Sequence, residues 1–247
     1  MGAIIPAILP TSREDLEVKL TLLQGVSNEV QVDVVDGRFA TPATWPYADC
    51  DASREADTAH AVETALADGA PPVLENFRFE VDLMVEDPMA QIGHWIRVGA
   101  SRITVHAETA RNLSQVIEAF TETYGRDKDF APDLLALGIA LNVSTEIDPL
   151  EETIAECDYV QFMGIAQIGK QGEPFDPRVL QKIHDFHTKH PDMPIQVDGG
   201  VSLETAPDLL RAGASRLVVG SGLWRAPDLK LEYGKFDELT QVHGIYS

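Results

Sequence analysis

The stretch NEVQVDVVDGRFA, residues 28–40, combines the features of a buried strand with two polar side chains. Its valines are the β-branched residues typical of a strand that is covered on both faces. Gln31 and Asp33 interrupt them, and because side chains alternate along a strand, these two residues share one face. An unpaired carboxylate in an apolar interior costs several kcal/mol or takes up a proton. This face of the strand therefore predicts a solvated or functional position for Asp33.

Seven further apolar segments resemble this one, and segments with helical spacing lie between them, for example the leucines at 16, 20, 22 and 23. Regular alternation of strand and helix predicts an α/β fold with a parallel sheet and helical crossovers. Eight such units predict one closed (β/α)8 barrel, and no linker divides residues 1–247. The eight expected strands lie within residues 3–9, 29–35, 77–85, 102–108, 135–143, 159–165, 194–200 and 216–222.

A short internal repeat supports this pattern. The segments GASRITV from Gly99 and GASRLVV from Gly213 each join the end of an expected helix to the start of an expected strand. Glycine is the residue most often found where a helix ends in the left-handed conformation. Both glycines are therefore expected to end helices.

Composition excludes several function classes. The chain has 40 acidic and 19 basic residues and a formal charge of -21, which repels nucleic acid and anionic lipid. No apolar run approaches the roughly 20 residues needed to cross a bilayer. The first residues do not resemble a signal peptide, and Cys50 and Cys157 lack metal-ligand spacing. We therefore expect a cytoplasmic protein that binds neither membrane nor nucleic acid.

Three aspartates lie toward the ends of the second, third and seventh expected strands. Asp33, Asp82 and Asp198 are predicted to converge at the carboxyl-terminal mouth of the barrel, where active sites of this architecture form. Three close carboxylates require either a cation or a bound proton. The alternative interpretation is that each caps a helix or pairs with an arginine.

Glycines follow the last three expected strands and predict a phosphate site. The loops after the seventh and eighth strands are the recurring phosphate site of such barrels, because glycine lets backbone N–H groups approach an oxyanion closely. A purely conformational role for the glycines is the alternative. The candidate phosphate-binding residues are Gly169, Gly172, Gly199, Gly200, Gly220 and Ser221, with Lys170 nearby in a loop that could close over the ligand.

The longest irregular stretch, residues 36–61, follows the second expected strand. Because it begins at the mouth of the barrel, it is either a lid over the site or a long loop that leads to a helix.

At this point the chain resembles the ribulose-phosphate 3-epimerase family over nearly its whole length. The matching segments occur in family order: PAILP, VDVVDGRFA, VDLMVEDP, ITVHAE, FMGIAQIGKQGEPF, VDGGV and VVGSGLW. The resemblance implies a TIM barrel of the ribulose-phosphate-binding type, acting on a small phosphorylated sugar. It also implies that Asp33 and Asp198 form an acid/base pair that inverts carbon 3 of a ketopentose phosphate through an enediolate. Met84 and Met163 match positions that contact the sugar.

The family binds a divalent metal with two histidines and two aspartates, and this chain departs from that pattern. Gln31 and Asp82 stand at the two histidine positions. Oxygen ligands suit Mg²⁺ or Mn²⁺ better than Zn²⁺, so a metal held by Gln31, Asp33, Asp82 and Asp198 would be one of the harder ions. A metal-free site with a protonated carboxylate, and a phosphosugar-binding barrel without epimerase activity, stay open. His106 also matches the family, and we expect a structural hydrogen bond for it.

Other phosphosugar enzymes are the remaining alternatives. A Schiff-base aldolase needs a lysine inside the barrel, and all seven lysines lie on expected helices or loops. A decarboxylase of the Asp-x-Lys-x-x-Asp kind needs a lysine in the third strand, which has none. A different phosphosugar isomerase or a metal-assisted lyase stays open. We also expect the barrel to form homo-oligomers.

Overall fold

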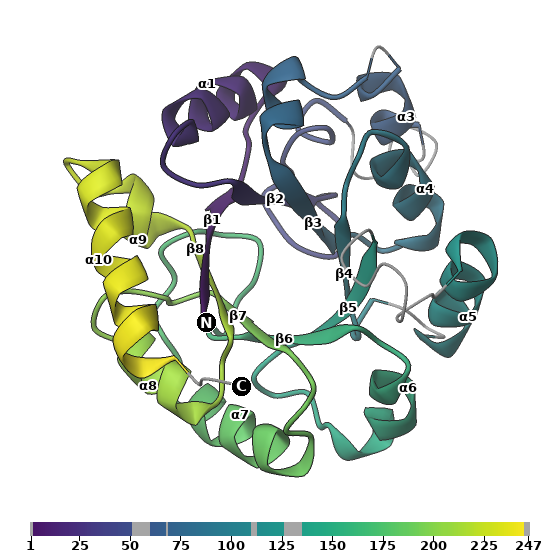
Figure 1. Ribbon diagram of the computed structural model, residues 1–247. Helices are drawn as coiled ribbons and strands as arrows, with labels where there is room; N and C mark the ends of the chain where they lie inside the picture. Colours follow the sequence, from purple (N-terminus) through teal and green to yellow (C-terminus); the bar gives the residue numbers. More distant parts are fainter. Residues whose placement is uncertain (1, 51–59, 68, 110–112, 126–134, 245–247) are drawn as a thin grey trace.

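Eight parallel strands close into a barrel in chain order (Figure 1). The computed structural model describes residues 2–50, 60–67, 69–109, 113–125 and 135–244. Each observed strand lies within its predicted segment, which confirms the (β/α)8 barrel. The strands are β1 Ala3–Ile8, β2 Glu29–Val35, β3 Arg78–Met84, β4 Arg102–His106, β5 Ala136–Leu141, β6 Tyr159–Met163, β7 Ile195–Asp198 and β8 Arg216–Val219.

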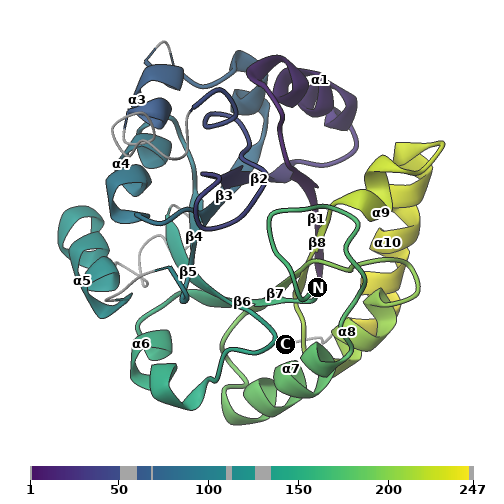
Figure 2. The ribbon, with the colours of Figure 1, turned by 180° about the vertical axis from the view of Figure 1, so that it is seen from behind.

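The helices form a ring outside the strands, as both views of the ribbon show (Figures 1 and 2). No helix in the described part is long and apolar enough to cross a membrane. The α-helices are α1 Arg13–Leu23, α3 Ala61–Ala65, α4 Met89–Arg97, α5 Leu113–Tyr124, α6 Glu151–Ala155, α7 Arg178–Lys189, α8 Ala206–Ala212, α9 Ser221–Trp224 and α10 Leu229–His243. Two 3₁₀ helices, η1 Pro72–Asn76 and η2 Asp148–Leu150, precede β3 and α6.

The main apolar core lies between the strands and the helices. It contains the valines of β2 that point away from the barrel axis and the buried face of each long helix. In α1 the leucines at 16, 20 and 23 are fully buried, whereas Leu22 is 59% exposed. Leu22 lies outside this buried face because its direction on the helix differs by about 200° from that of Leu20.

The predicted helix ends are confirmed. Gly213 ends α8 with a φ of 126°, and Gly99 follows α4 with a φ of 101°. Both are in the region that favours glycine.

The inside of the barrel is largely polar. Only a small apolar group, Ile5, Ala7 and Val218, lies on the inner face of β1 and β8. Most other inward positions of the strands hold buried polar residues: Gln31, Asp33, Glu80, Asp82, Thr104, His106, Gln161 and Gln196. A core of this kind is stable only when its groups bind one another, so the interior must contain a connected hydrogen-bond network.

The long segment after β2 begins at the mouth of the barrel and then enters the core. Asp36 accepts hydrogen bonds from the backbone N–H groups of Arg38 and Phe39, and the Phe39 ring lies 5.4 Å from the ring of His106. Trp45 packs edge-on against Trp95 of α4. The segment is therefore partly a cover and partly a packed connection, while residues 51–59 lie outside the described part.

Candidate active site

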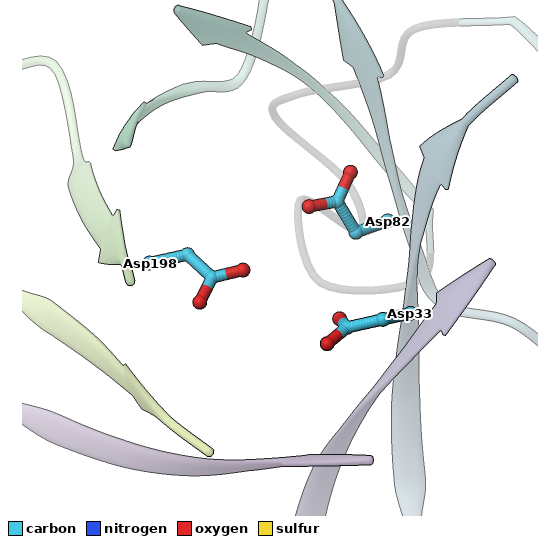
Figure 3. A group of neighbouring side chains, drawn as sticks. All are labelled: Asp33, Asp82 and Asp198. Atoms are coloured by element: carbon cyan, nitrogen blue, oxygen red, sulfur yellow. The ribbon is translucent and has the colours of Figure 1, made fainter. Parts of the chain in front are cut away.

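The three aspartates converge inside the barrel, as predicted (Figure 3). Asp33 and Asp82 are direct neighbours in the register of β2 and β3, and Asp198, the last residue of β7, points toward them from across the barrel. One carboxylate oxygen from each lies within 4.8 Å of one from each of the others. Asp33 and Asp82 are buried, and Asp198 is half-buried.

Gln31 joins two of these carboxylates. Its side-chain nitrogen Nε2 donates to Asp33 Oδ1 at 2.7 Å and to Asp198 Oδ2 at 2.9 Å. Gln31 is fully buried, so both hydrogens of the amide are used in an environment where an unmet donor would be costly. The amide therefore holds the two carboxylates at a fixed separation.

The third carboxylate has separate partners. Asp82 Oδ1 lies 3.0 Å from His106 Nε2, and Asp82 Oδ2 accepts from Gln161 Nε2 at 2.8 Å. The prediction of a structural hydrogen bond for His106 is confirmed, and its partner belongs to the aspartate group. No arginine in the described part pairs with these aspartates and none of them caps a described helix, so the described residues do not support the alternative interpretation.

Burial and neighbouring charges shift the pKa values of Asp33, Asp198 and His106. Burial and the charges of Asp198 and Asp82 raise the pKa of Asp33 well above its ordinary value. Burial and the charge of Asp82 raise the pKa of Asp198 to about 7. Burial alone would lower the pKa of His106, but the charge of Asp82 and its hydrogen bond raise that pKa to about 10. At neutral pH, His106 is thus a cation paired with Asp82, and at least one of Asp33 and Asp198 holds a proton.

A cavity of about 40 Å³ opens above Asp33 and Asp198. Gln31 and Asp82 are fully buried and do not line it. Its lining brings together all six predicted phosphate-loop residues, both predicted methionines and Lys170: Met84, Met163, Gly169, Lys170, Gly172, Gly199, Gly200, Gly220 and Ser221. The structure therefore places the candidate acid/base pair and the glycine loops around one space.

Close packing also requires glycine at several of these positions. A Cβ on Gly172 would lie 2.2 Å from the guanidinium of Arg225, and one on Gly199 would lie 2.7 Å from Ile165. Gly172 and Gly199 have φ values of 85° and 92°. The conformational role considered for the glycines thus exists alongside any role in binding phosphate.

Sequence comparisons agree with the resemblance. A family model described as the ribulose-phosphate 3 epimerase family matches residues 3–224. This chain belongs to the ribulose-phosphate 3-epimerase family. The ribulose-phosphate 3-epimerase of Bacillus subtilis is 28% identical over 237 residues, covering 93% of this chain and 95% of the relative. The protein of the same name from a Synechocystis strain is also 28% identical, covering 91% of this chain and 88% of the relative. Both names denote isomerases.

Solved structures agree on the fold. The 3-keto-L-gulonate-6-phosphate decarboxylase of Vibrio cholerae superposes with a TM-score of 0.66 at 14% identity, covering 99% of this chain and 100% of that one. At this identity the likeness shows a shared barrel architecture.

The family's metal centre does not fit the hydrogen bonds of this member. The spacing of the three carboxylates would admit one hard divalent ion. However, Gln31 presents a nitrogen with two hydrogens to Asp33 and Asp198, and such a nitrogen offers no lone pair to a metal. Each oxygen of Asp82 accepts one hydrogen bond and keeps a further lone pair. For Gln31 to act as the oxygen ligand expected from the sequence, its amide would have to turn so that Oε1 faces the aspartates, and this ligand set stays a prediction.

Two residues of the site were missed from the sequence. Gln161 interrupts the apolar strand β6 and shares a face with Met163, so the alternation that identified Gln31 and Asp33 could have found it. Arg216, at the start of β8, binds Gln196 and Glu80 inside the barrel. Arg216 is the first residue of its strand, and the sequence there does not indicate that its side chain points inward.

Proposed function

We propose that this protein interconverts the two epimers at carbon 3 of a ketopentose phosphate, with ribulose 5-phosphate as the first substrate to test. The observation that carries the proposal is the position of Asp33 and Asp198, which approach one small cavity from opposite sides of the barrel. Epimerisation next to a carbonyl needs a base on one face of the carbon and an acid on the other. Family membership supports the same reaction.

The protonation of the two aspartates suits this chemistry. The pKa of Asp33 is the more strongly raised by burial and neighbouring charge, whereas that of Asp198 is about 7. In one direction, ionised Asp198 removes the proton from carbon 3, and the electron pair forms an enediolate with carbon 2. Protonated Asp33 then delivers its proton to the opposite face of carbon 3. In the reverse reaction the two residues exchange roles.

The glycine loops are proposed to hold the phosphate. Backbone N–H groups of loops that line a cavity can bind an oxyanion without a charged side chain. Among the described lysines, Lys170 alone lines the cavity, and it would add a positive charge close to the glycines. Local donors of this kind are needed because the chain as a whole is strongly acidic. Met84 and Met163 would contact the apolar side of the sugar.

We propose that the reaction requires no zinc. A Mg²⁺ or Mn²⁺ ion on the carboxylates remains the alternative, and chelation followed by elemental analysis separates the two. Self-association, cytoplasmic location and a single domain over residues 1–247 stay predictions.

Binding of a phosphosugar without turnover is the second candidate function, because both family histidines are replaced. A Schiff-base lyase has no support, since the described lysines lie on α1, α7, α10 and the loop after β6.

The proposal is tested by incubating the purified protein with ribulose 5-phosphate and following the sugar by proton NMR. We expect xylulose 5-phosphate to accumulate, and no product from unphosphorylated ribulose. Saturable binding without any change of the sugar would support the second candidate. Appearance of a product with a different carbon skeleton or a different epimerised carbon would contradict the proposal.

A further inference from the structure

We infer that an ion-pair network at the base of the barrel fixes the direction of the active-site amides, so that Gln31 bridges Asp33 and Asp198 as a hydrogen-bond donor in place of a metal. The inference deepens the proposed function, but its evidence is the hydrogen-bond geometry alone.

The argument begins at Arg216, at the start of β8. Its Nη2 lies 2.9 Å from carboxylate oxygens of Glu29 and Glu80, and its Nε donates to Gln196 Oε1 at 2.8 Å. Glu80 is also paired with Arg102 at 3.1 Å. A guanidinium group can only donate. The atom of Gln196 that faces Arg216 must therefore be the oxygen.

The other end of the same amide gives an independent constraint. Gln196 Nε2 lies 2.8 Å from Glu80 Oε1. A carboxylate held between two guanidinium groups accepts hydrogen bonds. Reversing the Gln196 amide would place N–H against N–H at Arg216 and oxygen against oxygen at Glu80. Both contacts would leave buried polar groups unpaired, so only one direction is stable.

The direction of the Gln196 amide decides the direction of the side-chain amides of Gln31 and Gln161. Gln196 Nε2 lies 3.1 Å from Gln31 Oε1 and 2.9 Å from Gln161 Oε1. Gln196 Nε2 has two hydrogens for these two oxygens and that of Glu80, so at least one contact shares a hydrogen. An N–H2 group of either neighbour turned toward this nitrogen would meet no lone pair, so both neighbours present oxygens to it. Their own nitrogens are then turned toward the aspartates, Gln31 toward Asp33 and Asp198, and Gln161 toward Asp82.

The consequence concerns what can occupy the space between the catalytic carboxylates. Each of Asp33 and Asp198 receives one N–H from Gln31, which does part of what a cation would do by stabilising negative charge. The same N–H2 group points its hydrogens at the place where a metal would have to bind. The base of the barrel thus excludes the metal by setting the direction of the Gln31 amide, which Gln196 contacts across the barrel interior. Arg216, Glu80 and Gln196 are positioning residues for the pair.

The first test measures Mn²⁺ binding to the metal-stripped protein by electron paramagnetic resonance. We expect no stoichiometric site in the wild type, and one Mn²⁺ per chain bound roughly tenfold or more tightly in Gln31→Glu, since added carboxylate charge strengthens binding of hard cations. Gln24→Glu, which adds the same charge at the exposed end of α1, gives the background. One wild-type Mn²⁺ that Asp33→Asn abolishes would overturn the inference, as would a Gln31→Glu variant that binds no more than the control.

The second test replaces the hydrogen-bond donor at position 196 by an acceptor. Because Gln196 Nε2 lies 2.8 Å from Glu80 Oε1, the change is made as the double variant Glu80→Gln/Gln196→Glu, which keeps the net charge and avoids a carboxylate pair. The carboxylate at 196 then accepts from Arg216 and from the new amide at 80, so Gln31 and Gln161 are expected to turn their nitrogens to it and their oxygens to the aspartates, and Mn²⁺ binding should appear. Gln196→Met removes the same amide without reversing anything and should leave binding at the control level. Equal behaviour of the two variants would show that Gln196 only fills space, which would overturn its positioning role.

A third measurement needs no variant. Neutron diffraction from wild-type crystals in D₂O should show two deuterium atoms on the Gln31 atom nearest Asp198, and an oxygen there would refute the inference. These readouts do not depend on turnover. A protein without epimerase activity but with this amide direction would contradict the proposed function and leave the inference intact.

Discussion

The side-chain nitrogen of Gln31 lies 2.9 Å from Asp198 Oδ2, although 167 residues separate the two in the chain. The bond crosses the barrel from β2 to β7, and because Gln31 also donates to Asp33, it links the two aspartates that we propose as the acid/base pair. Two carboxylates that approach a common space repel each other when both are ionised. A donor between them, with a proton on one of them, is the way in which this chain stabilises the pair.

Glu108, in the loop after β4, is predicted to make a pH-dependent contribution to the free energy of unfolding. Burial alone would raise the pKa of Glu108, but the imidazole of His106, whose Nδ1 lies 3.7 Å from the carboxylate, and a hydrogen bond from Thr145 lower it from 4.5 to about 2. Glu108 also accepts from the backbone of Asn142 at 2.9 Å. Since the pKa is lower in the folded state, the stabilisation is complete above about pH 4.5 and is lost as the pH falls through about 2.

Glu108→Gln should therefore lower the free energy of unfolding by about 1–2 kcal/mol at pH 7, measured by urea denaturation. The difference from the wild type should shrink in a series of buffers below pH 4.5. Glu118→Gln, on the exposed face of α5, is the matched control and should change little. A deficit for Glu108→Gln that stays constant down to the lowest pH would contradict the assignment.

Gly138, inside β5, is predicted to be required because the neighbouring ring of Tyr159 leaves no room for a side chain. A Cβ on Gly138 would lie 2.2 Å from ring atoms of Tyr159, which is fully buried and hydrogen-bonded to Thr104. Gly138→Ala should destabilise the protein by about 1–3 kcal/mol, as overpacking does. Gly234→Ala in α10, where a Cβ meets nothing within 4 Å, should instead stabilise by about 0.5–1 kcal/mol. Thermal unfolding of both variants checks the pair, and equal effects would refute the packing argument.

The loop between β6 and α7 is predicted to move during substrate binding. The cavity beneath it, about 40 Å³, holds only a few waters at the roughly 10–15 Å³ of such volume that each needs, so a pentose phosphate does not fit the observed conformation. Gln171 in this loop donates to the carbonyl of Ala7 at 3.3 Å and helps to hold the loop down.

Removal of that bond should make the closed form less populated. Gln171→Ala is expected to lower KM about fivefold, equivalent to one ordinary hydrogen bond, with a smaller change in kcat, because more of the free protein is then in the open form that admits the substrate. Gln181→Ala on the exposed face of α7 should leave both constants unchanged. Steady-state kinetics with ribulose 5-phosphate would contradict this role for the loop if KM stayed at the wild-type value.

Much of the fold could be predicted from one rule, the alternation of side chains along a strand. The alternation that places Gln31 and Asp33 on one face of a strand also identified the inward residues of β3 and β7, and parallel strands bring their carboxyl ends to one mouth. The convergence of Asp33, Asp82 and Asp198 therefore needed no tertiary information beyond the barrel itself.

The direction of the hydrogen bonds could not be predicted in this way. An amide has an oxygen and a nitrogen of nearly equal size, and the sequence-based choice of an oxygen ligand for Gln31 had no means of deciding between them. The decision comes from Arg216 and Gln196, which are distant in the chain and meet Gln31 only inside the closed barrel. Likewise, the pairing of His106 with Asp82 depends on strand register rather than on a local pattern.

The most direct test of the account is the exchange of the carbon-3 proton of ribulose 5-phosphate with deuterated solvent, followed by NMR in the wild type, Asp33→Asn and Asp198→Asn. The account predicts measurable exchange in the wild type and a loss of at least about a hundredfold in each variant, while phosphate binding measured by calorimetry is largely kept. Exchange at the wild-type rate in either variant would contradict the assignment of that aspartate to the proton transfer.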